Sequence, residues 1–189
     1  MTMRPDSQPE LWDLIREDWT SHGRDWTRPG FRALAIYRFG VWRRGQPAAI
    51  RALVGFPYRA LHRFARNLYG IELPDTARIG RRVVIEHQSG IVIHGGAVIG
   101  DECTLRQNVT IGNRRRRSPL DAPTLGNRVD VGAGAKILGC VDIGDDAIIG
   151  ANAVVLDHVP AGATAVGIPA RIVGKESSLR ADASHDGIA

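Results

Sequence analysis

The feature that most constrains this chain is an aliphatic residue that returns at every sixth position from Leu73 onward. This period fits neither an α-helix, which repeats after about 3.6 residues, nor a strand that alternates every two. It is typical of a parallel β-helix, in which three groups of six form one coil of roughly eighteen residues. The series comprises Leu73, Ile79, Ile85, Ile91, then Ile93, Ile99, Leu105, Ile111, then Leu125, Val131, Ile137, Ile143, Ile149 and Val155.

Small residues around this series indicate the same architecture. Glycine often follows the aliphatic position and permits a left-handed backbone at a corner, as at Gly80, Gly100 and Gly144. Two residues before it the side chain is usually small or β-branched, as at Ala97 and Val109. About four or five coils are implied.

The first 70 residues have helical patterns instead. The segment 7–10 resembles a capping box, a second helix is expected over about 31–44, and a third over about 48–69, disturbed at Pro57 and ended by Gly70. The predicted fold is therefore mainly β. A left-handed parallel β-helix over 71–174 is preceded by a small α-helical N-terminal region over 1–70 and followed by a flexible tail over 175–189.

The net charge, the cysteine content and the hydropathy of the sequence limit the kinds of function that it can have. The 189 residues carry a net charge of +5, which suits phosphates, polyanionic substrates or an acidic membrane. Cys103 and Cys140 stand far apart, which argues against a disulfide framework or a cysteine-based zinc site, and no metal is expected. No apolar signal core or run of about 18 apolar residues is present, so a cytoplasmic protein is expected.

Four segments resemble the bacterial serine acetyltransferase family. They are ALAIYRFGVWRRG (33–45), RRVVIEHQSGIVI (81–93), VGAGAKILG (131–139) and GIPARIVG (167–174). The resemblance implies a left-handed β-helix enzyme that transfers the acetyl group of acetyl-CoA to the hydroxyl of L-serine. It also implies a homotrimer with sites in the clefts between subunits.

The resemblance assigns residues to roles. His87 matches the catalytic histidine, and Glu72 matches the carboxylate that pairs with it. Glu86 and Asp18 match acceptor-binding acids. The positions that line the coenzyme A groove match Gly112, Ala133 and Ala151.

The same residues suit the chemistry. A neutral imidazole with a pKa near about 6.5 can accept a hydroxyl proton at neutral pH, and a carboxylate stabilises the resulting imidazolium. No serine or cysteine nucleophile accompanies His87, which favours direct attack by the acceptor on the thioester. Guanidinium groups bind phosphate well, so the loop that interrupts the repeat, with Arg114 and Arg115, is a candidate coenzyme A contact. Further candidates are Lys136 and Arg171.

Three features depart from the family. Asp121 and Ala122 occupy the place of an active-site arginine–histidine pair. The helical region is about half the usual length, and the chain ends in Ala189 rather than isoleucine.

Alternatives remain open. The acceptor is either serine or a sugar hydroxyl of an exopolysaccharide precursor, and a non-catalytic β-helix scaffold is the alternative of another class. The basic, aromatic helix over 31–44 could lie on an acidic membrane, but packing on the solenoid explains it more simply. No nucleic-acid motif accompanies the arginines.

Overall fold

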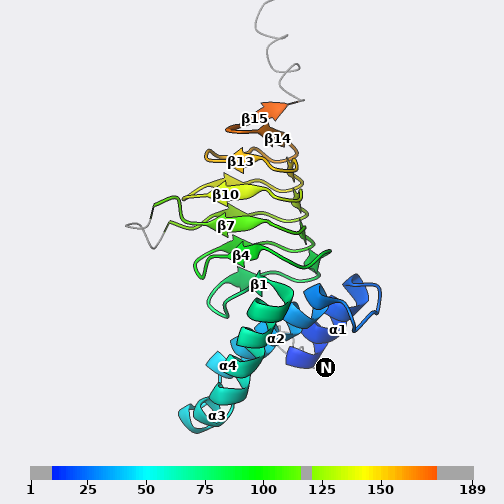
Figure 1. The fold of residues 1–189 in the computed structure, drawn as a ribbon, viewed down its shortest axis with the longest axis vertical. Coiled ribbons are helices and arrows are strands. Elements are labelled where there is room, and N and C mark those ends of the chain that lie inside the picture. Colours follow the sequence, from blue (N-terminus) through cyan, green and yellow to red (C-terminus); the bar gives the residue numbers. More distant parts are fainter. Residues whose placement is uncertain (1–9, 116–120, 174–189) are drawn as a thin grey trace, which may run out of the picture.

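In the computed structural model, which describes residues 10–115 and 121–173, a stack of coils stands on a base of helices (Figure 1). The helices precede Gly70 and the strands follow it. The predicted tail over 175–189 and part of the capping box lie outside the described residues. No described helix is long and apolar enough to cross a bilayer.

Three parallel sheets form the walls of the solenoid, and this confirms the predicted β-helix. Among the described strands, only the last pair, β14 with β15, is antiparallel. The first sheet contains β1 (Ile71–Glu72), β4 (Ile91–Ile93), β7 (Thr110–Gly112), β10 (Lys136–Leu138) and β13 (Val154–Val155). The second contains β2 (Arg78–Ile79), β5 (Val98–Ile99), β8 (Thr124–Leu125) and β11 (Asp142–Ile143). The third contains β3 (Val84–Ile85), β6 (Thr104–Leu105), β9 (Asp130–Val131), β12 (Ile148–Ile149), β14 (Thr164–Gly167) and β15 (Ala170–Val173).

The six-residue series forms the core. Every one of its members, from Leu73 to Val155, is at most 9% exposed. Strand register stacks equivalent residues directly, so that Ile137 lies between Ile111 and Val155. Burial of these aliphatic columns is the main favourable term in the folding of the solenoid.

One corner of the first coil is enlarged where the repeat slips. Ile91 and Ile93 of β4 both point inward and are buried, whereas Val92 between them is exposed. The corner that leads into β4 spans residues 86–90, and the next coil turns the same corner with residues 106–108. The two extra residues push this corner outward, and all five of its residues are exposed.

The helical base consists of α1 (Leu11–Ser21), α2 (Pro29–Arg44), α3 (Ala48–Leu53), α4 (Gly55–Phe64) and the π-helix η1 (Ala65–Tyr69). The third predicted helix is broken at Val54, not at Pro57 as predicted. Pro57 is the third residue of α4, where a backbone N–H has no intrahelical partner to lose. Gly70 ends η1 with a φ of 63°, as predicted from its position.

A buried ion pair joins the helices to the first coil. The Arg38 guanidinium of α2 contacts both carboxylate oxygens of Asp18 in α1, at 2.9 and 3.3 Å. Two further N–H groups of the guanidinium donate to the backbone carbonyls of Ile79 and Gly80, at 2.9 and 2.6 Å. The helix expected over 31–44 therefore packs on the end of the solenoid.

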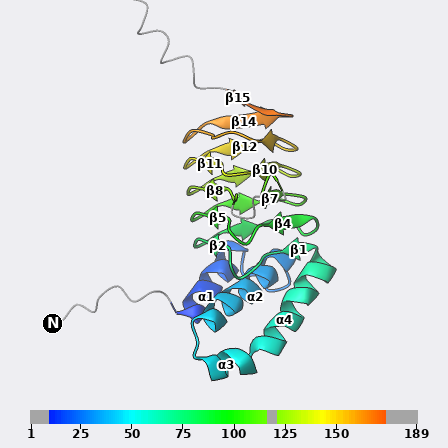
Figure 2. The ribbon, with the colours of Figure 1, turned by 90° about the vertical axis from the view of Figure 1, so that its left-hand side faces the viewer.

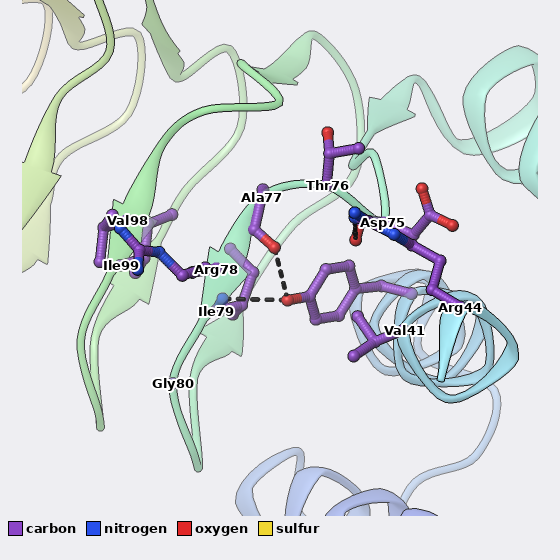
Figure 3. Close-up of a pocket in the computed structure, with 11 residues that line it drawn as sticks. Val41, Arg44, Asp75, Thr76, Ala77, Arg78, Ile79, Gly80, Val98 and Ile99 are labelled. Atoms are coloured by element: carbon purple, nitrogen blue, oxygen red, sulfur yellow. Dashed lines mark hydrogen bonds between the residues drawn. The ribbon is translucent and has the colours of Figure 1, made fainter. Parts of the chain in front are cut away.

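Tyr37 adds a second link between α2 and β2. Its hydroxyl donates to the carbonyl of Ala77 at 2.9 Å and accepts from the N–H of Ile79 at 3.0 Å (Figure 3). Burial raises the pKa of this hydroxyl, so it stays protonated.

His22 and Gly30 fix the strand that leads to the enlarged corner. The His22 Nδ1 lies 2.7 Å from the carbonyl of Asp18, and its Nε2 accepts from the Ile85 N–H at 3.2 Å. This pattern requires the neutral ring with its proton on Nδ1. A Cβ on Gly30 would lie 2.1 Å from the Ile85 carbonyl oxygen, so only glycine permits this approach of α2.

Breaking the buried ion pair between Arg38 and Asp18 should strongly reduce the stability of the protein. Asp18→Asn should lower the free energy of unfolding by about 3–5 kcal/mol, because the Arg38 charge stays buried without its counter-ion. The double variant Asp18→Leu/Arg38→Met should recover part of this loss. Urea unfolding of the three proteins measures it, and a neutral single substitution would contradict this role.

His22 predicts a pH dependence of stability. Burial lowers the pKa of His22 in the folded protein. The unfolded chain takes up a proton on this residue below about pH 6.5 and the folded chain does not, so stability falls as pH falls, by up to about 1.4 kcal/mol per pH unit. Urea unfolding between about pH 7 and pH 5 should show a shallower fall for His22→Gln. Equal slopes for His22→Gln and wild type would refute the assignment.

Candidate functional site

The enlarged corner presents Glu86 and His87 to solvent, directly after β3. His87 belongs to a column of corners in which backbone N–H groups bond to carbonyls one coil below. Asn108 N–H donates to Ser89 O, and Asn152 N–H donates to Ala133 O, each at 2.8 Å. The corresponding corners of the later coils are shorter. In the third and fourth coils these corners carry the small residues Ala133 and Ala151. A protruding imidazole therefore stands at one end of a narrow, small-residue edge.

Glu72 lies near the start of this edge. It is the exposed second residue of β1, and its strand neighbour is Val92 of β4, five residues after His87. Within residues 10–115 and 121–173, the side chains of Glu72 and His87 form no hydrogen bond or ion pair with each other. The pairing of these two side chains stays a prediction.

Glu86 has a partner that sequence reasoning missed. Its Oε2 lies 2.8 Å from Nε of Arg106, and the same guanidinium bonds to Asp130. Glu86 follows β3, Arg106 follows β6, and Asp130 lies in β9. These three strands are neighbours in one sheet. The hydrogen bond with Asp130 raises the pKa of Arg106 and keeps it charged. The sequence could have indicated this contact, because Arg106 follows Glu86 by twenty residues, which is the length of one coil here.

Asp18 does not reach this corner. Its side chain is 1% exposed and both carboxylate oxygens contact Arg38. Burial raises its pKa, and the Arg38 hydrogen bond opposes that shift. Its geometry supports a role in holding α1 and α2 on the solenoid, so the proposed acceptor site does not include it.

The expected coenzyme A contacts occupy several places. Gly112 ends β7, and Arg114 and Arg115 after it line a small hollow with Gly139 and Cys140. The Lys136 ammonium of β10 bonds to the carbonyl of Asn108, beside the corner column.

Arg171 lies elsewhere. It is part of β15 at the end of the solenoid farthest from the helices, whereas β4 lies close to them (Figure 1). The structure does not bring Arg171 together with His87. Arg116 and Arg117, the next two residues of the loop that carries Arg114 and Arg115, lie outside the described residues.

The hollow shown in Figure 3 is not this site. It lies between α2 and the strands β2 and β5, and its lining includes Tyr37, Asp75 and Arg78 but none of the predicted site residues. The described residues also contain no group of three or more His, Cys, Asp or Glu side chains placed to hold a metal ion. On one chain, the candidate site is an exposed edge.

The fold and this edge define the class of protein. A family profile described as "Bacterial transferase hexapeptide (six repeats)" matches residues 122–157. A solved serine acetyltransferase from Brucella abortus in complex with coenzyme A has a TM-score of 0.76 at 28% identity, covering 88% of this chain and 68% of that one. The chain is a hexapeptide-repeat acyltransferase with a left-handed β-helix.

More similar sequences give the particular family. The serine acetyltransferase of Helicobacter pylori strain J99 is 45% identical over 148 residues, which are 78% of this chain and 83% of that protein. A soybean serine acetyltransferase solved with serine has a TM-score of 0.75 at 33% identity, and covers 88% of this chain and 70% of that one. The chain belongs to the serine acetyltransferase family.

Proposed function

We infer that this protein transfers the acetyl group of acetyl-CoA to the hydroxyl of L-serine, with His87 as the general base. The observation that carries the inference is the enlarged corner, which exposes Glu86 and His87 together on a chain that is 45% identical to a serine acetyltransferase. The similar structures solved with coenzyme A and with serine support both substrates.

The reaction needs one base and a good leaving group. The His87 imidazole takes the proton of the serine hydroxyl as its oxygen attacks the thioester carbonyl. The tetrahedral intermediate collapses, the C–S bond breaks, and the thiolate of coenzyme A leaves with the electron pair. The His87 imidazolium then returns the proton to that thiolate. In this proposal the Glu72 carboxylate stabilises the imidazolium.

The acceptor is held by the acid beside the base. Serine carries an ammonium group, and the exposed Glu86 carboxylate attracts it. Arg106 holds Glu86 from the coil above, while Asp130 satisfies the other side of the guanidinium. Because one cation lies between two carboxylates, the cluster keeps a net negative charge for a cationic acceptor group.

The coenzyme lies along the corner column in this proposal. Ala133 and Ala151 leave room for the thin pantetheine arm, and Gly112 does the same at the end of β7. Arg114, Arg115 and Lys136 supply positive charge for phosphate groups. Arg171 joins them only if another subunit brings its solenoid end to this edge.

A second subunit completes the site in our proposal. An exposed edge lacks the second wall that excludes water from an acyl transfer. A homotrimer with cyclic symmetry places the edge of one solenoid against a wall of the next and yields three equivalent sites. We propose a cytoplasmic location, because acetyl-CoA is available there.

An acceptor panel tests the reaction. Purified protein should release coenzyme A from acetyl-CoA in the presence of L-serine, and much more slowly with nucleotide sugars. His87→Ala should lower kcat by about 10²–10⁴-fold, which is the usual contribution of a general base. His158→Ala, at an exposed histidine on another corner, should keep wild-type activity. Turnover of a sugar but not of serine would assign the other acceptor, and unchanged activity of His87→Ala would refute the mechanism.

Arg106 predicts a specific kinetic effect. Arg106→Leu should raise KM for serine by about tenfold, the cost of roughly one charge-assisted hydrogen bond, because Glu86 loses its support. KM for acetyl-CoA should stay unchanged. Arg128→Leu is the matched control, since Arg128 forms a similar exposed ion pair with Asp146 on another corner. An unchanged KM for serine in Arg106→Leu would show that the ion pair does not position Glu86.

A further inference from the structure

The segment from α3 to η1 has two apolar faces, and only one of them is covered. The inner face contains Gly55, Tyr58, Ala65 and Tyr69, which are buried. Tyr58 lies against Phe39 of α2, with ring centroids 6.4 Å apart. This face explains how the segment attaches to the helical base.

The second face points away from the protein. Leu53 is 78% exposed, Phe56 73%, Phe64 48% and Leu68 62%. Phe56 and Phe64 lie eight residues apart on α4, Leu68 follows four residues later on η1, and Leu53 ends α3 just before the break at Val54. Ile50 and Leu61 add to the same exposed apolar surface, at 41% and 43%. We call these six residues the outer face.

Charge around the outer face has one sign. Arg51, Arg59, Arg63 and Arg66 are all exposed on the same segment. The sequence contains no aspartate or glutamate from residue 26 to residue 71. Exposed apolar side chains are therefore flanked by cations only, and no carboxylate of the segment neutralises them.

The position of the segment leaves the outer face accessible. α3 and α4 project from the base of the molecule, on the side away from the solenoid (Figures 1 and 2). The predicted site residues all lie on the solenoid or at its junction with α1 and α2. A surface bound to the outer face does not use any of them.

We propose that the outer face binds an anionic lipid bilayer, with α3 and α4 lying in the headgroup region. Large apolar side chains enter the boundary of the acyl chains, while the long arginine side chains reach the phosphates. Each basic residue near such a surface adds electrostatic attraction that salt weakens. Acetyl transfer would then take place at a membrane surface. This inference does not depend on which hydroxyl is acetylated.

A second copy of the chain is a poorer occupant. A two-fold contact through the outer face places four arginines opposite four arginines. The outer face could instead meet α1 of another copy, but α1 offers only Asp13 as an acid without an ion pair among the described residues, since Glu17 pairs with Arg81 and Asp18 with Arg38. An anionic bilayer meets both the apolar and the cationic character of the face.

Vesicle co-sedimentation of the full chain tests the proposal. Vesicles of phosphatidylglycerol and phosphatidylcholine in equal amounts should pellet the protein, and pure phosphatidylcholine should not. Phe56→Ser/Phe64→Ser should reduce the partition coefficient at least about tenfold, because two large apolar anchors are lost. Arg59→Gln/Arg63→Gln should reduce it by about tenfold or more, and added salt should have a similar effect.

Control variants separate lipid binding by the outer face from non-specific adsorption, misfolding and self-association. Trp12→Ser removes an equally exposed aromatic residue, 70% exposed on α1, and should bind vesicles as the wild type does. All variants should keep the wild-type circular dichroism and acetyl-transfer activity. The proposal is overturned if wild type does not pellet with anionic vesicles, if it pellets equally with neutral ones, or if Trp12→Ser loses as much binding as the phenylalanine variant. Concentration-dependent association without lipid, abolished by Phe56→Ser/Phe64→Ser and accompanied by no vesicle binding, would assign the face to a second copy.

Discussion

The guanidinium of Arg38 is buried against Asp18 and the carbonyls of Ile79 and Gly80, and it joins the helical base to the first coil of the solenoid. A parallel β-helix ends in an apolar interior and in backbone groups without a next coil to bond them. One guanidinium satisfies two of these carbonyls and ties them to both α1 and α2. Burying this ion pair costs the desolvation of two charges, and four hydrogen bonds of the guanidinium offset that cost. The helical base therefore covers the open end of the solenoid.

The same junction sets the geometry of the candidate site. His22 accepts the N–H of Ile85, and Gly30 lets α2 lie against the carbonyl of that residue. The next two residues are Glu86 and His87, at the beginning of the enlarged corner. Strand β3 is held by α2 and His22, and the enlarged corner follows it directly. This arrangement supports the exposed His87 rigidly, and acyl transfer requires a rigidly placed base. Arg106 extends this support to Glu86 from the coil above.

Much of this arrangement could be predicted from sequence because a solenoid repeats itself locally. The period of six identified the aliphatic columns of the core, although not the buried Ile71 and Val141, and its slip between Ile91 and Ile93 marked the coil that carries His87. The break of the third helix at Val54 was missed, since Pro57 is the stronger breaker but stands where a helix tolerates it. The contacts of His22 and Arg38 were missed because they join positions 63 and 41 residues apart that no periodicity relates. The buried place of Asp18 depends on the same contacts. Arg106 was within reach, because one coil of twenty residues separates it from Glu86.

In the proposed reaction the acetyl group passes directly from the thioester to the acceptor hydroxyl, and the exposed base of the enlarged corner moves only a proton. The fate of the acetyl group in a single turnover tests this mechanism most directly. Protein mixed with a limiting amount of acetyl-CoA is quenched over time and its intact mass is followed beside the small products. Direct transfer predicts unmodified protein throughout, and release of coenzyme A with formation of O-acetylserine only when serine is present. Acetylated protein that forms without serine and then disappears when serine is added would contradict it.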